Sequence, residues 1–258
     1  MGGALAEASI KSVGAENIFV YDTDAKKIKD FADRTDANIS DIEYIVLNCD
    51  YIFLGVKPQI LKVLFEKVAP IIEQRTTDFV LVSMAAGISV HTVETLAGVD
   101  CPIIRIMPNM PVSVGEGMIL YTANEFVSKE DIDGFCEIMK CAGVLDKIDE
   151  DKIDAASCVS GCGPAFAFMF CEALADGAVK CGLPREKAML YAAQTLVGSA
   201  EMLLKTGEHP AKLKDAVCSP AGSTIEGVKA LEEGAFRAST MNAVKNAYER
   251  TLELGKQK

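Results

Sequence analysis

Residues 51–58 read YIFLGVKP, an apolar run rich in β-favouring residues that ends in a proline-containing turn. A short apolar run bounded by turn residues is typical of a strand that is buried on both faces. Residues 59–74 follow with apolar side chains at helical spacing, so the stretch predicts a strand, a turn and a helix. A unit of this kind indicates an α/β fold built on a parallel sheet.

Further strands and helices of the same kind lie on both sides of this unit. The pattern predicts a helix at residues 26–34 and strands at residues 17–22, 79–84 and 103–107. Strands rich in Val, Ile and Phe that alternate with helices form parallel sheets covered on both faces. Ligands of such sheets bind at the carboxyl ends of the strands. We therefore expect a parallel-sheet domain over residues 1–150, with a ligand site at that edge.

The character of the sequence changes after residue 150. Helical patterns then follow one another without a further strand pattern, at residues 151–157, 164–181, 184–206 and 235–254. These helices are apolar on more than one face and include small residues such as Ala173, Ala192 and Gly198. Small residues permit close helix packing, and a surplus apolar face is typically covered by a partner chain. We expect an all-helical domain over residues 151–258 that forms a homodimer.

The composition argues against several classes of partner. The 258 residues carry a net charge of -11 and no block of Lys or Arg, whereas nucleic acids and anionic membranes require a basic surface. The longest apolar run, residues 165–171, is too short to span a bilayer. Nine cysteines without a C-x-x-C pair are typical of reduced cytoplasmic thiols, and the presence of only two histidines argues against a zinc site. We expect a cytoplasmic protein with a small-molecule ligand and no metal.

The turn at residues 219–224, SPAGST, precedes an amphipathic helix. A helix that begins at Ser223 or Thr224 leaves its first amide N–H groups without partners, and its dipole favours negative charge there. The hydroxyls of Ser219 and Thr224 add further donors. An ordinary serine or threonine cap gives the same pattern. The turn is therefore a candidate carboxylate site.

The same turn resembles the signature of the pyrroline-5-carboxylate reductases. In that family a Ser-Pro-Ala/Gly-Gly-x-Thr sequence holds the substrate carboxylate, and its threonine faces the ring nitrogen. The resemblance covers nearly the whole chain, from residue 1 to about residue 254. It implies that Thr224 is catalytic and that the substrate is bound by Ser219, Gly222, Ser223 and Thr224.

Three turns of the first half resemble the cofactor segments of that family in their order and spacing. They are Val56-Lys57-Pro58, Ala85-Ala86-Gly87 and Met107-Pro108-Asn109, and each follows an expected strand. Taken singly, each supplies only the Gly or Pro that such a loop needs. The resemblance implies a Rossmann-like domain that binds reduced NADP or NAD through Val56, Lys57, Pro58, Ala85, Ala86 and Asn109.

The amino terminus departs from the family pattern. A dinucleotide site normally opens with a strand and a G-x-G-x-x-G loop, whereas Met1-Gly2 matches only the last two positions of that loop. By this resemblance Met1 and Gly2 face the cofactor, while the first strand and two glycines are missing. The sheet would then have a wide apolar slot between two unpaired edges. We expect either a shortened gene model or expressed chain, or a natural chain with impaired cofactor binding.

Two acidic residues each have two possible roles. Asp22 ends an expected strand, where a carboxylate accepts from the ribose of NAD and repels the 2′-phosphate of NADP. It suits equally well as a cap of the next helix, and Lys26 and Lys27 can reach a phosphate. Glu150 matches a family position near bound proline, although an acidic run also starts many solvated helices. The choice between NADP and NAD is therefore open.

Residues 160–166, SGCGPAF, resemble the family's Ser-Gly-Ser-Gly-Pro-Ala-Tyr segment, which begins the long helix under the active site. Cys162 and Phe166 replace a serine and a tyrosine, so two hydroxyls are lost. We expect this segment to shape the pocket without taking part in the chemistry.

The resemblance implies reduction of 1-pyrroline-5-carboxylate to L-proline, the last step of proline biosynthesis. Addition of hydride to the C=N bond is easier when the nitrogen is protonated or hydrogen-bonded, a contact that Thr224 can supply or relay. The family also implies a homodimer through the helical domain, and a decamer of five dimers as the larger assembly.

Two other functions fit parts of the sequence. A dehydrogenase of the β-hydroxyacid type shares the two-domain plan, but it requires a lysine soon after the glycine-rich segment. Here the first lysine after Gly163 is Lys180, which argues against that class. A non-catalytic nucleotide-binding homologue is favoured only by the incomplete glycine loop.

Overall fold

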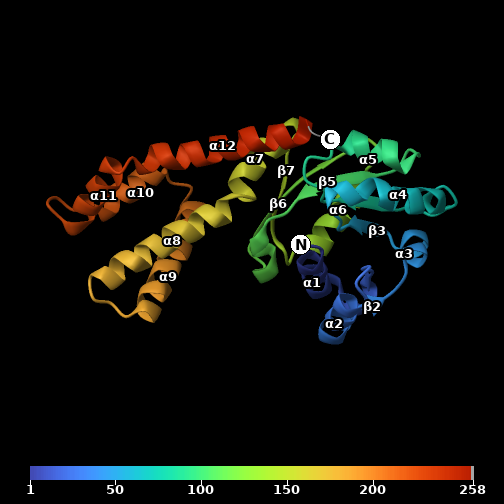
Figure 1. The fold of residues 1–258 in the computed structure, drawn as a ribbon, viewed down its shortest axis with the longest axis horizontal. Helices are drawn as coiled ribbons and strands as arrows, with labels where there is room; N and C mark the ends of the chain where they lie inside the picture. The colour runs from blue at the N-terminus through green and yellow to red at the C-terminus, as the bar shows by residue number, and fades with distance from the viewer. Residues whose placement is uncertain (257–258) are drawn as a thin grey trace. The chain divides into compact units, whose positions relative to one another are not determined.

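The computed structural model describes residues 1–256, which form two compact units (Figure 1). By tertiary contacts, the first unit comprises Met1–Gly161 with the residues from Tyr248 onward, and the second comprises Cys162–Ala247. The sequence predicted a division after residue 150. The division by contacts comes later because helix α7 (Glu150–Ser160) packs against strand β6 (Gly117–Ala123) of the sheet.

The first unit alternates helices and strands along the chain. From the amino terminus to strand β5, the helices and strands of this unit are α1 (Gly2–Val13), β1 (Phe19–Val20), α2 (Ala25–Thr35), β2 (Asn38–Ile39), α3 (Ile42–Asn48), β3 (Tyr51–Leu54), α4 (Pro58–Ile72), β4 (Val80–Ser83), α5 (Val90–Ala97) and β5 (Ile103–Met107). After β6 come α6 (Lys129–Met139) and β7 (Gly143–Lys147). The strands predicted at residues 51–56, 79–84 and 103–107 are confirmed as β3, β4 and β5.

Five strands form the main sheet in the order β3-β4-β5-β6-β7. Strands β3, β4 and β5 are parallel, with Leu81 of β4 opposite Ile103 of β5. Strand β6 is antiparallel to β5, which the prediction of a parallel sheet did not include. The reversal arises because β5 and β6 are joined by a short 3₁₀ turn, Met110–Val114, whereas a parallel pair needs a longer crossover.

The slot expected from the sequence is present between two separate sheets. Among the described residues, β1 pairs only with β2, and β3 pairs only with β4. A cavity of about 1910 Å³ lies between them and is lined by residues of both β1 and β3. Ligand pockets typically measure about 300–1,000 Å³, so this space is larger than one small ligand requires.

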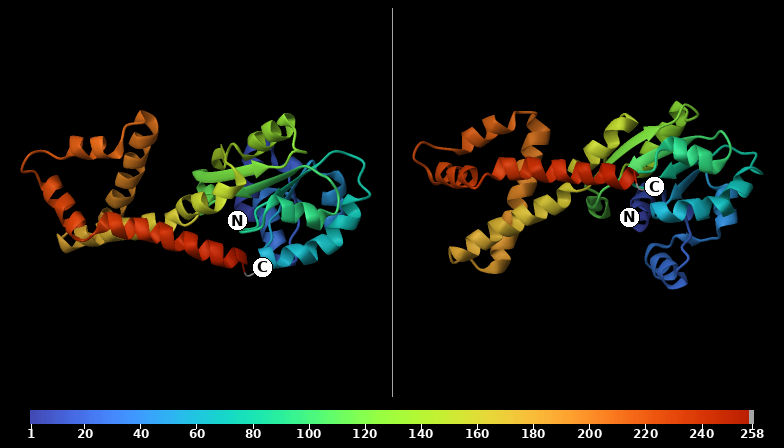
Figure 2. Two further views of the ribbon diagram at one scale, coloured as in Figure 1. Left: turned by 90° about the horizontal axis from the view of Figure 1, so that it is seen from above. Right: turned by 45° about the horizontal axis from the view of Figure 1, so that its top comes forward.

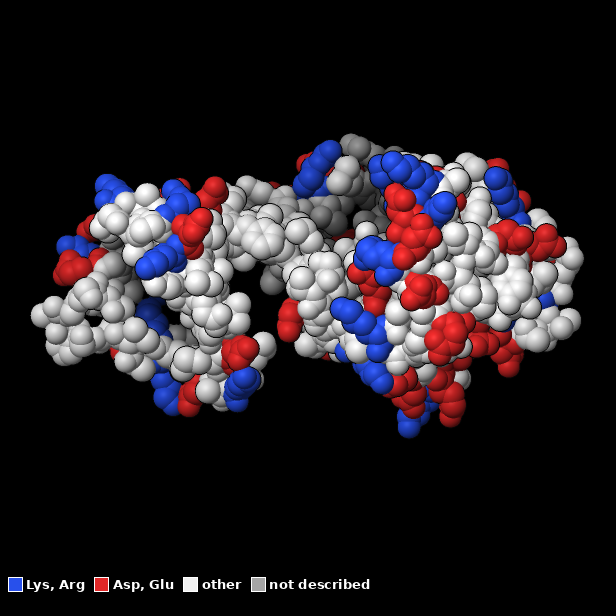
Figure 3. Space-filling view, turned by 90° about the horizontal axis from the view of Figure 1, so that it is seen from below, with Lys and Arg blue, Asp and Glu red and all other residues white. Residues whose placement is uncertain are grey.

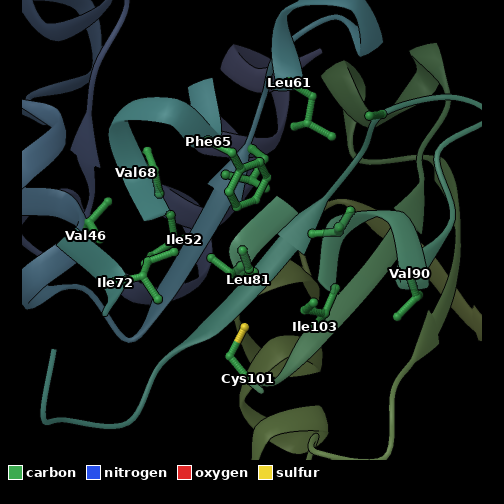
Figure 4. Packing of buried hydrophobic residues seen from close by; sticks show 14 residues of the cluster. Val46, Ile52, Leu61, Phe65, Val68, Ile72, Leu81, Val90, Cys101 and Ile103 are labelled. Atoms are coloured by element: carbon green, nitrogen blue, oxygen red, sulfur yellow. The ribbon is translucent and has the colours of Figure 1, made fainter. Parts of the chain in front are cut away.

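Two apolar cores cover the two faces of the main sheet. One packs α4 and α5 against β3, β4 and β5, and Figure 4 shows Phe65 of α4 directed toward the sheet near Leu81. The other packs α1 and α6 against the opposite face, through Leu5, Phe135 and Met139. Burial on both faces explains why these strands are apolar throughout and do not alternate with polar residues.

The second unit is entirely helical. Its helices are α8 (Gly163–Lys180), α9 (Arg185–Thr206), α10 (Pro210–Val217), α11 (Ser223–Glu233) and the first part of α12 (Phe236–Lys256), the long red helix of Figure 2. The predicted helices at residues 164–181, 184–206 and 235–254 correspond to α8, α9 and α12.

The helical unit has almost no core of its own. Within the described part of the chain, its buried apolar cluster consists of Ala175, Ala188 and Ala192. Large apolar side chains lie outside, and Met169 and Leu204 are 69% and 83% exposed. Figure 3 shows broad uncharged areas on the visible face of this unit. The predicted surplus of apolar helix face is therefore present.

Within residues 1–256, one stretch, residues 150–180 across α7 and α8, is long and apolar enough to cross a membrane by length and composition. The shorter apolar run noted in the sequence, at residues 165–171, is only a part of this stretch. Helices of globular proteins pass the same test, so the stretch does not by itself indicate a membrane protein.

Replacing Phe65 by alanine should lower the free energy of unfolding by about 3–5 kcal/mol, because the ring is 2% exposed and its removal leaves a cavity. Urea denaturation followed by circular dichroism measures the change. The matched control is Val63→Ala on the same helix, whose side chain is 52% exposed and should contribute less than about 0.5 kcal/mol. Equal losses in both variants would contradict the assignment of this core.

Candidate functional site

Five of the residues predicted to bind the cofactor line the cavity beside β1 and β3. They are Met1, Gly2, Asp22, Val56 and Lys57. They come from the start of α1, the end of β1 and the turn after β3, which are far apart in sequence. The fold brings these segments together because parallel strands end at the same edge of the sheet.

The first turn of α1 supplies main-chain donors to this cavity. Met1 is the N-cap and makes no side-chain capping hydrogen bond, and Leu5 N–H donates to Met1 O at 3.1 Å. In the described part of the chain, the N–H groups of Gly2, Gly3 and Ala4 therefore have no helical partner. These residues line the cavity, where the end of a helix can bind a phosphate.

Asp22 is bonded on both carboxylate oxygens. Oδ1 accepts from Asp24 N–H at 3.0 Å, and Oδ2 accepts from Lys27 Nζ at 2.6 Å. The hydrogen bond from Lys27 is the main cause that lowers the pKa of Asp22 below its ordinary value of 3.8. The cap of α2 is Asp24, which accepts from the N–H groups of Lys26 and Lys27. The helix cap that the sequence suggested for Asp22 is therefore Asp24.

The other predicted cofactor residues do not line the cavity. Pro58 is the first residue of α4, Ala85 is buried in the apolar core beside it, and Ala86 lies exposed in the next turn. Asn109 is buried, and both ends of its side-chain amide form hydrogen bonds within the protein. Nδ2 donates to Ser160 O and Oδ1 accepts from Met118 N–H, both at 2.9 Å. Its contact with the cofactor stays a prediction.

Glu150 belongs to an ion-pair cluster that sequence reasoning missed. Its Oε1 accepts from Arg105 Nη1 at 2.9 Å and from Val90 N–H at 2.8 Å. Arg105 Nη2 also donates to Asp154 Oδ1 at 3.3 Å. The signal for this cluster was a single arginine in the otherwise apolar strand IIRIM, residues 103–107, because a buried charge requires a partner.

The turn before α11 has the geometry of an anion site. The helix begins at Ser223, one of the two starts that the sequence predicted, and its N-cap, Gly222, makes no side-chain capping bond. A Cβ atom at Gly222 would collide with Ser219 Oγ, so glycine leaves room for that hydroxyl. Ala221 adopts φ 57°, a left-handed conformation that is strained for alanine and recurs at functional turns.

The turn is accessible to a ligand. Ser219 and Ser223 are exposed and Thr224 is half-buried. No hydrogen bond joins the hydroxyl of Ser219, Ser223 or Thr224 to another of the described residues. Free main-chain N–H groups and free hydroxyls therefore occur together at the start of a helix of 11 residues.

Sequence comparison places both halves of the chain. Residues 150–254 match the family model for pyrroline-5-carboxylate reductase dimerisation, and residues 1–87 match the model for NADP oxidoreductase, coenzyme F420-dependent. The chain is 40% identical to the pyrroline-5-carboxylate reductase of Escherichia coli K12 over 258 residues, which cover 99% of this chain and 93% of that protein. This chain belongs to the pyrroline-5-carboxylate reductase family.

Other members of the family give the same assignment. The pyrroline-5-carboxylate reductase of Methanosarcina acetivorans is 39% identical over 259 residues, 99% of this chain and 95% of that protein. The crystal structure of Plasmodium falciparum pyrroline carboxylate reductase with NADP bound has a TM-score of 0.86 and 34% identity, and the match covers 99% of this chain and 94% of that one.

The family assignment accounts for features of both units. The helical unit lies within the family's dimerisation domain, which explains why its large apolar side chains are exposed in a single chain. Cys162 is the N-cap of α8, so the segment at residues 160–166 begins a long helix as predicted. The family assignment also sets aside the β-hydroxyacid dehydrogenase alternative.

Replacing Lys27 by methionine should raise the pKa of the Asp22 carboxyl toward its ordinary value. Because Lys27 lowers that pKa in the folded chain, the pair stabilises the fold above pH 3.8, and its contribution is lost as pH falls through the folded pKa. NMR titration of the Asp22 carboxyl measures the effect. Lys29→Met on the same helix is the control, and an equal shift there would contradict the assignment.

Proposed function

We propose that this chain reduces 1-pyrroline-5-carboxylate to L-proline with NADPH or NADH. The observation that carries the proposal is the accessible, uncapped turn before α11, which combines main-chain N–H donors with the hydroxyls of Ser219, Ser223 and Thr224. A cyclic imine with a carboxylate needs this set of groups: donors for the acid, and one hydroxyl for the ring nitrogen. Membership of the reductase family supports it.

The substrate carboxylate would accept hydrogen bonds from the N–H groups at the start of α11. Ser219, Gly222 and Ser223 form this seat, in which the positive end of the helix dipole favours the negative charge. Binding at a fixed turn orients the ring before reaction, and positioning of reactants can lower a barrier by several kcal/mol. Glu150 was also predicted near the substrate, but in the structure its carboxylate accepts hydrogen bonds from Arg105 and from Val90 N–H.

Thr224 would act on the ring nitrogen. Its hydroxyl has no partner among the described residues and so remains free to donate to the nitrogen as the C=N bond is reduced. A donor placed where charge changes during the reaction stabilises the transition state more than the bound substrate. Bound NADPH or NADH supplies the hydride.

The cavity of the first unit fits a dinucleotide. Main-chain N–H groups at the start of α1 would bind its phosphates, while Val56 and Lys57 would border it at the turn after β3. The cavity, at about 1910 Å³, is larger than a typical ligand pocket because the two sheets are separate. Contacts from Pro58, Ala85, Ala86 and Asn109 remain part of the proposal through the family resemblance alone.

The proposed assembly is a homodimer through the helical domain, with five dimers in a decamer as the larger form. The match of residues 150–254 to the family's dimerisation model supports the dimer. We propose a cytoplasmic location, which nine free cysteines favour because thiols stay reduced there. The net charge of -11 favours a small-molecule partner over nucleic acid or an anionic membrane.

Purified protein should oxidise NADPH or NADH when 1-pyrroline-5-carboxylate is added, with L-proline as the product. Thr224→Ala should lower kcat/KM by about a hundredfold while the circular dichroism spectrum stays the same, because a positioned proton donor contributes about 10²–10⁴ in rate. Thr224→Ser, which keeps the hydroxyl, is the matched control and should retain most of the activity.

Equal turnover in Thr224→Ala and the wild type would remove Thr224 from the chemistry. Cofactor binding without any turnover in the wild type would favour the non-catalytic nucleotide-binding homologue.

Lys27 is proposed to set how well NADPH is accepted. An acidic residue at the end of this strand normally selects NAD, because it repels the 2′-phosphate of NADP. Here Lys27 neutralises Asp22 at 2.6 Å, and its own side chain is 71% exposed at the cavity. The lysine can therefore offset the repulsion and meet a phosphate itself.

Lys27→Ala should weaken NADPH binding about fivefold and NADH binding by less than about twofold, because loss of one charge contact near the surface costs about 1 kcal/mol. Fluorescence titration of the two reduced cofactors gives both dissociation constants. Lys29→Ala is the control, since Lys29 is on the same helix outside the cavity lining. A parallel loss for NADPH and NADH would show that Lys27 does not discriminate between them.

A further inference from the structure

The loop at residues 84–89, between β4 and α5, contains two of the predicted cofactor residues, Ala85 and Ala86. Both ends of this loop adjoin the same ion-pair cluster. Ser83, just before the loop, is opposite Arg105 in the register of β4 and β5. Val90, just after it, donates its N–H to Glu150 Oε1 at 2.8 Å. The loop therefore starts and ends beside charged groups of the cluster.

Arg105 and Glu150 join these two ends. The Arg105 side chain is 5% exposed, and its Nη1 donates to the same Glu150 oxygen that accepts from Val90. Arg105 Nη2 donates to Asp154, one turn further along α7. One carboxylate oxygen thus fixes the distance between β5 and the first residue of α5.

The helix that carries Glu150 is itself held at its far end. Asn109 Nδ2 donates to Ser160 O, the last residue of α7, and Asn109 Oδ1 accepts from Met118 N–H at the start of β6. Helix α7 is therefore bonded to the sheet side at both its first and its last residue. Glu150 cannot shift without moving a helix that is fixed elsewhere.

Stability alone does not explain this arrangement. The arginine is 5% exposed, whereas the side chains of Glu150 and Asp154 are 36% and 32% exposed, and ion pairs with partly exposed carboxylates add little net stability. Two further polar atoms, Ser83 Oγ and Arg105 Nε, are buried without a partner among the described residues, and each costs free energy. A cluster that adds little net stability, leaves buried polar atoms unpaired and adjoins both ends of one loop is better explained by the geometry that it imposes on that loop.

We propose that Arg105 and Glu150 are positioning residues for the nicotinamide cofactor. They hold the 84–89 loop, whose first residue, Met84, lines the cavity, in one conformation beside the dinucleotide, although neither Arg105 nor Glu150 touches the cofactor itself. The inference rests on the proposed function and deepens it. It gives Glu150 a role through the loop in place of direct contact with the substrate.

The test measures NADPH binding by fluorescence titration together with amide hydrogen exchange of residues 84–90. The variants are E150A, which removes the bond to Val90, and E150Q, which keeps an oxygen acceptor without the charge. D154N is the matched control, because Asp154 pairs with the same arginine but makes no bond to Val90. Circular dichroism confirms that each variant is folded.

E150A should raise the Kd for NADPH about tenfold and speed exchange at Val90 by a similar factor, since a hydrogen bond to a charged acceptor is lost. E150Q should show a smaller change, and D154N should stay within about twofold of the wild type. In steady-state kinetics, KM for NADPH should rise while kcat changes little.

Three results would overturn the inference. They are an unchanged Kd in E150A, equal losses in E150A and D154N, and a raised KM for 1-pyrroline-5-carboxylate with the Kd for NADPH unaffected. The last result would place Glu150 at the substrate. If the wild type binds NADPH without reducing the imine, the proposed function fails while the Kd series still decides this inference.

Discussion

The direction of the strands is the constraint on which the first unit depends. Strand β1 is parallel to β2, and strands β3, β4 and β5 are parallel to one another, so the segments that follow them emerge at the carboxyl edge of the sheets. Burial on both faces fixes the register, because the strands have no polar face that could tolerate a slip. Small residues and proline at those ends leave the main chain accessible, and the turn after β3 contributes Gly55, Val56 and Lys57 to the cavity lining.

Much of this architecture could be predicted because it depends on local patterns. The apolar runs of β3, β4 and β5 and the helical spacing of α4, α8 and α9 are visible in single stretches of sequence. The start of α11 at Ser223 could be predicted for the same reason, since the turn before it contains proline, glycine and hydroxyl residues. The family signature at this turn then indicated the substrate class, which local patterns do not encode.

The features that sequence reasoning missed depend on pairing between distant residues. Strand β6 is antiparallel to β5 because a short turn reverses the chain. The residues of each strand alone do not indicate whether it pairs in a parallel or an antiparallel direction. The ion pair between Arg105 and Glu150 joins residues 45 positions apart. Strand β1 comprises only Phe19–Val20 and pairs with the equally short β2, so the predicted strand at residues 17–22 is mostly outside the ladder.

The alanine-only core of the helical unit has a consequence for how the enzyme responds to its own abundance. Three buried alanines supply little apolar surface, so most of the stabilisation of this half must come from association with another copy. Folding and association are then one equilibrium, and the population of complete molecules grows with the square of protomer concentration when the protein is scarce. A cell that halves synthesis of this chain would lose more than half of its activity.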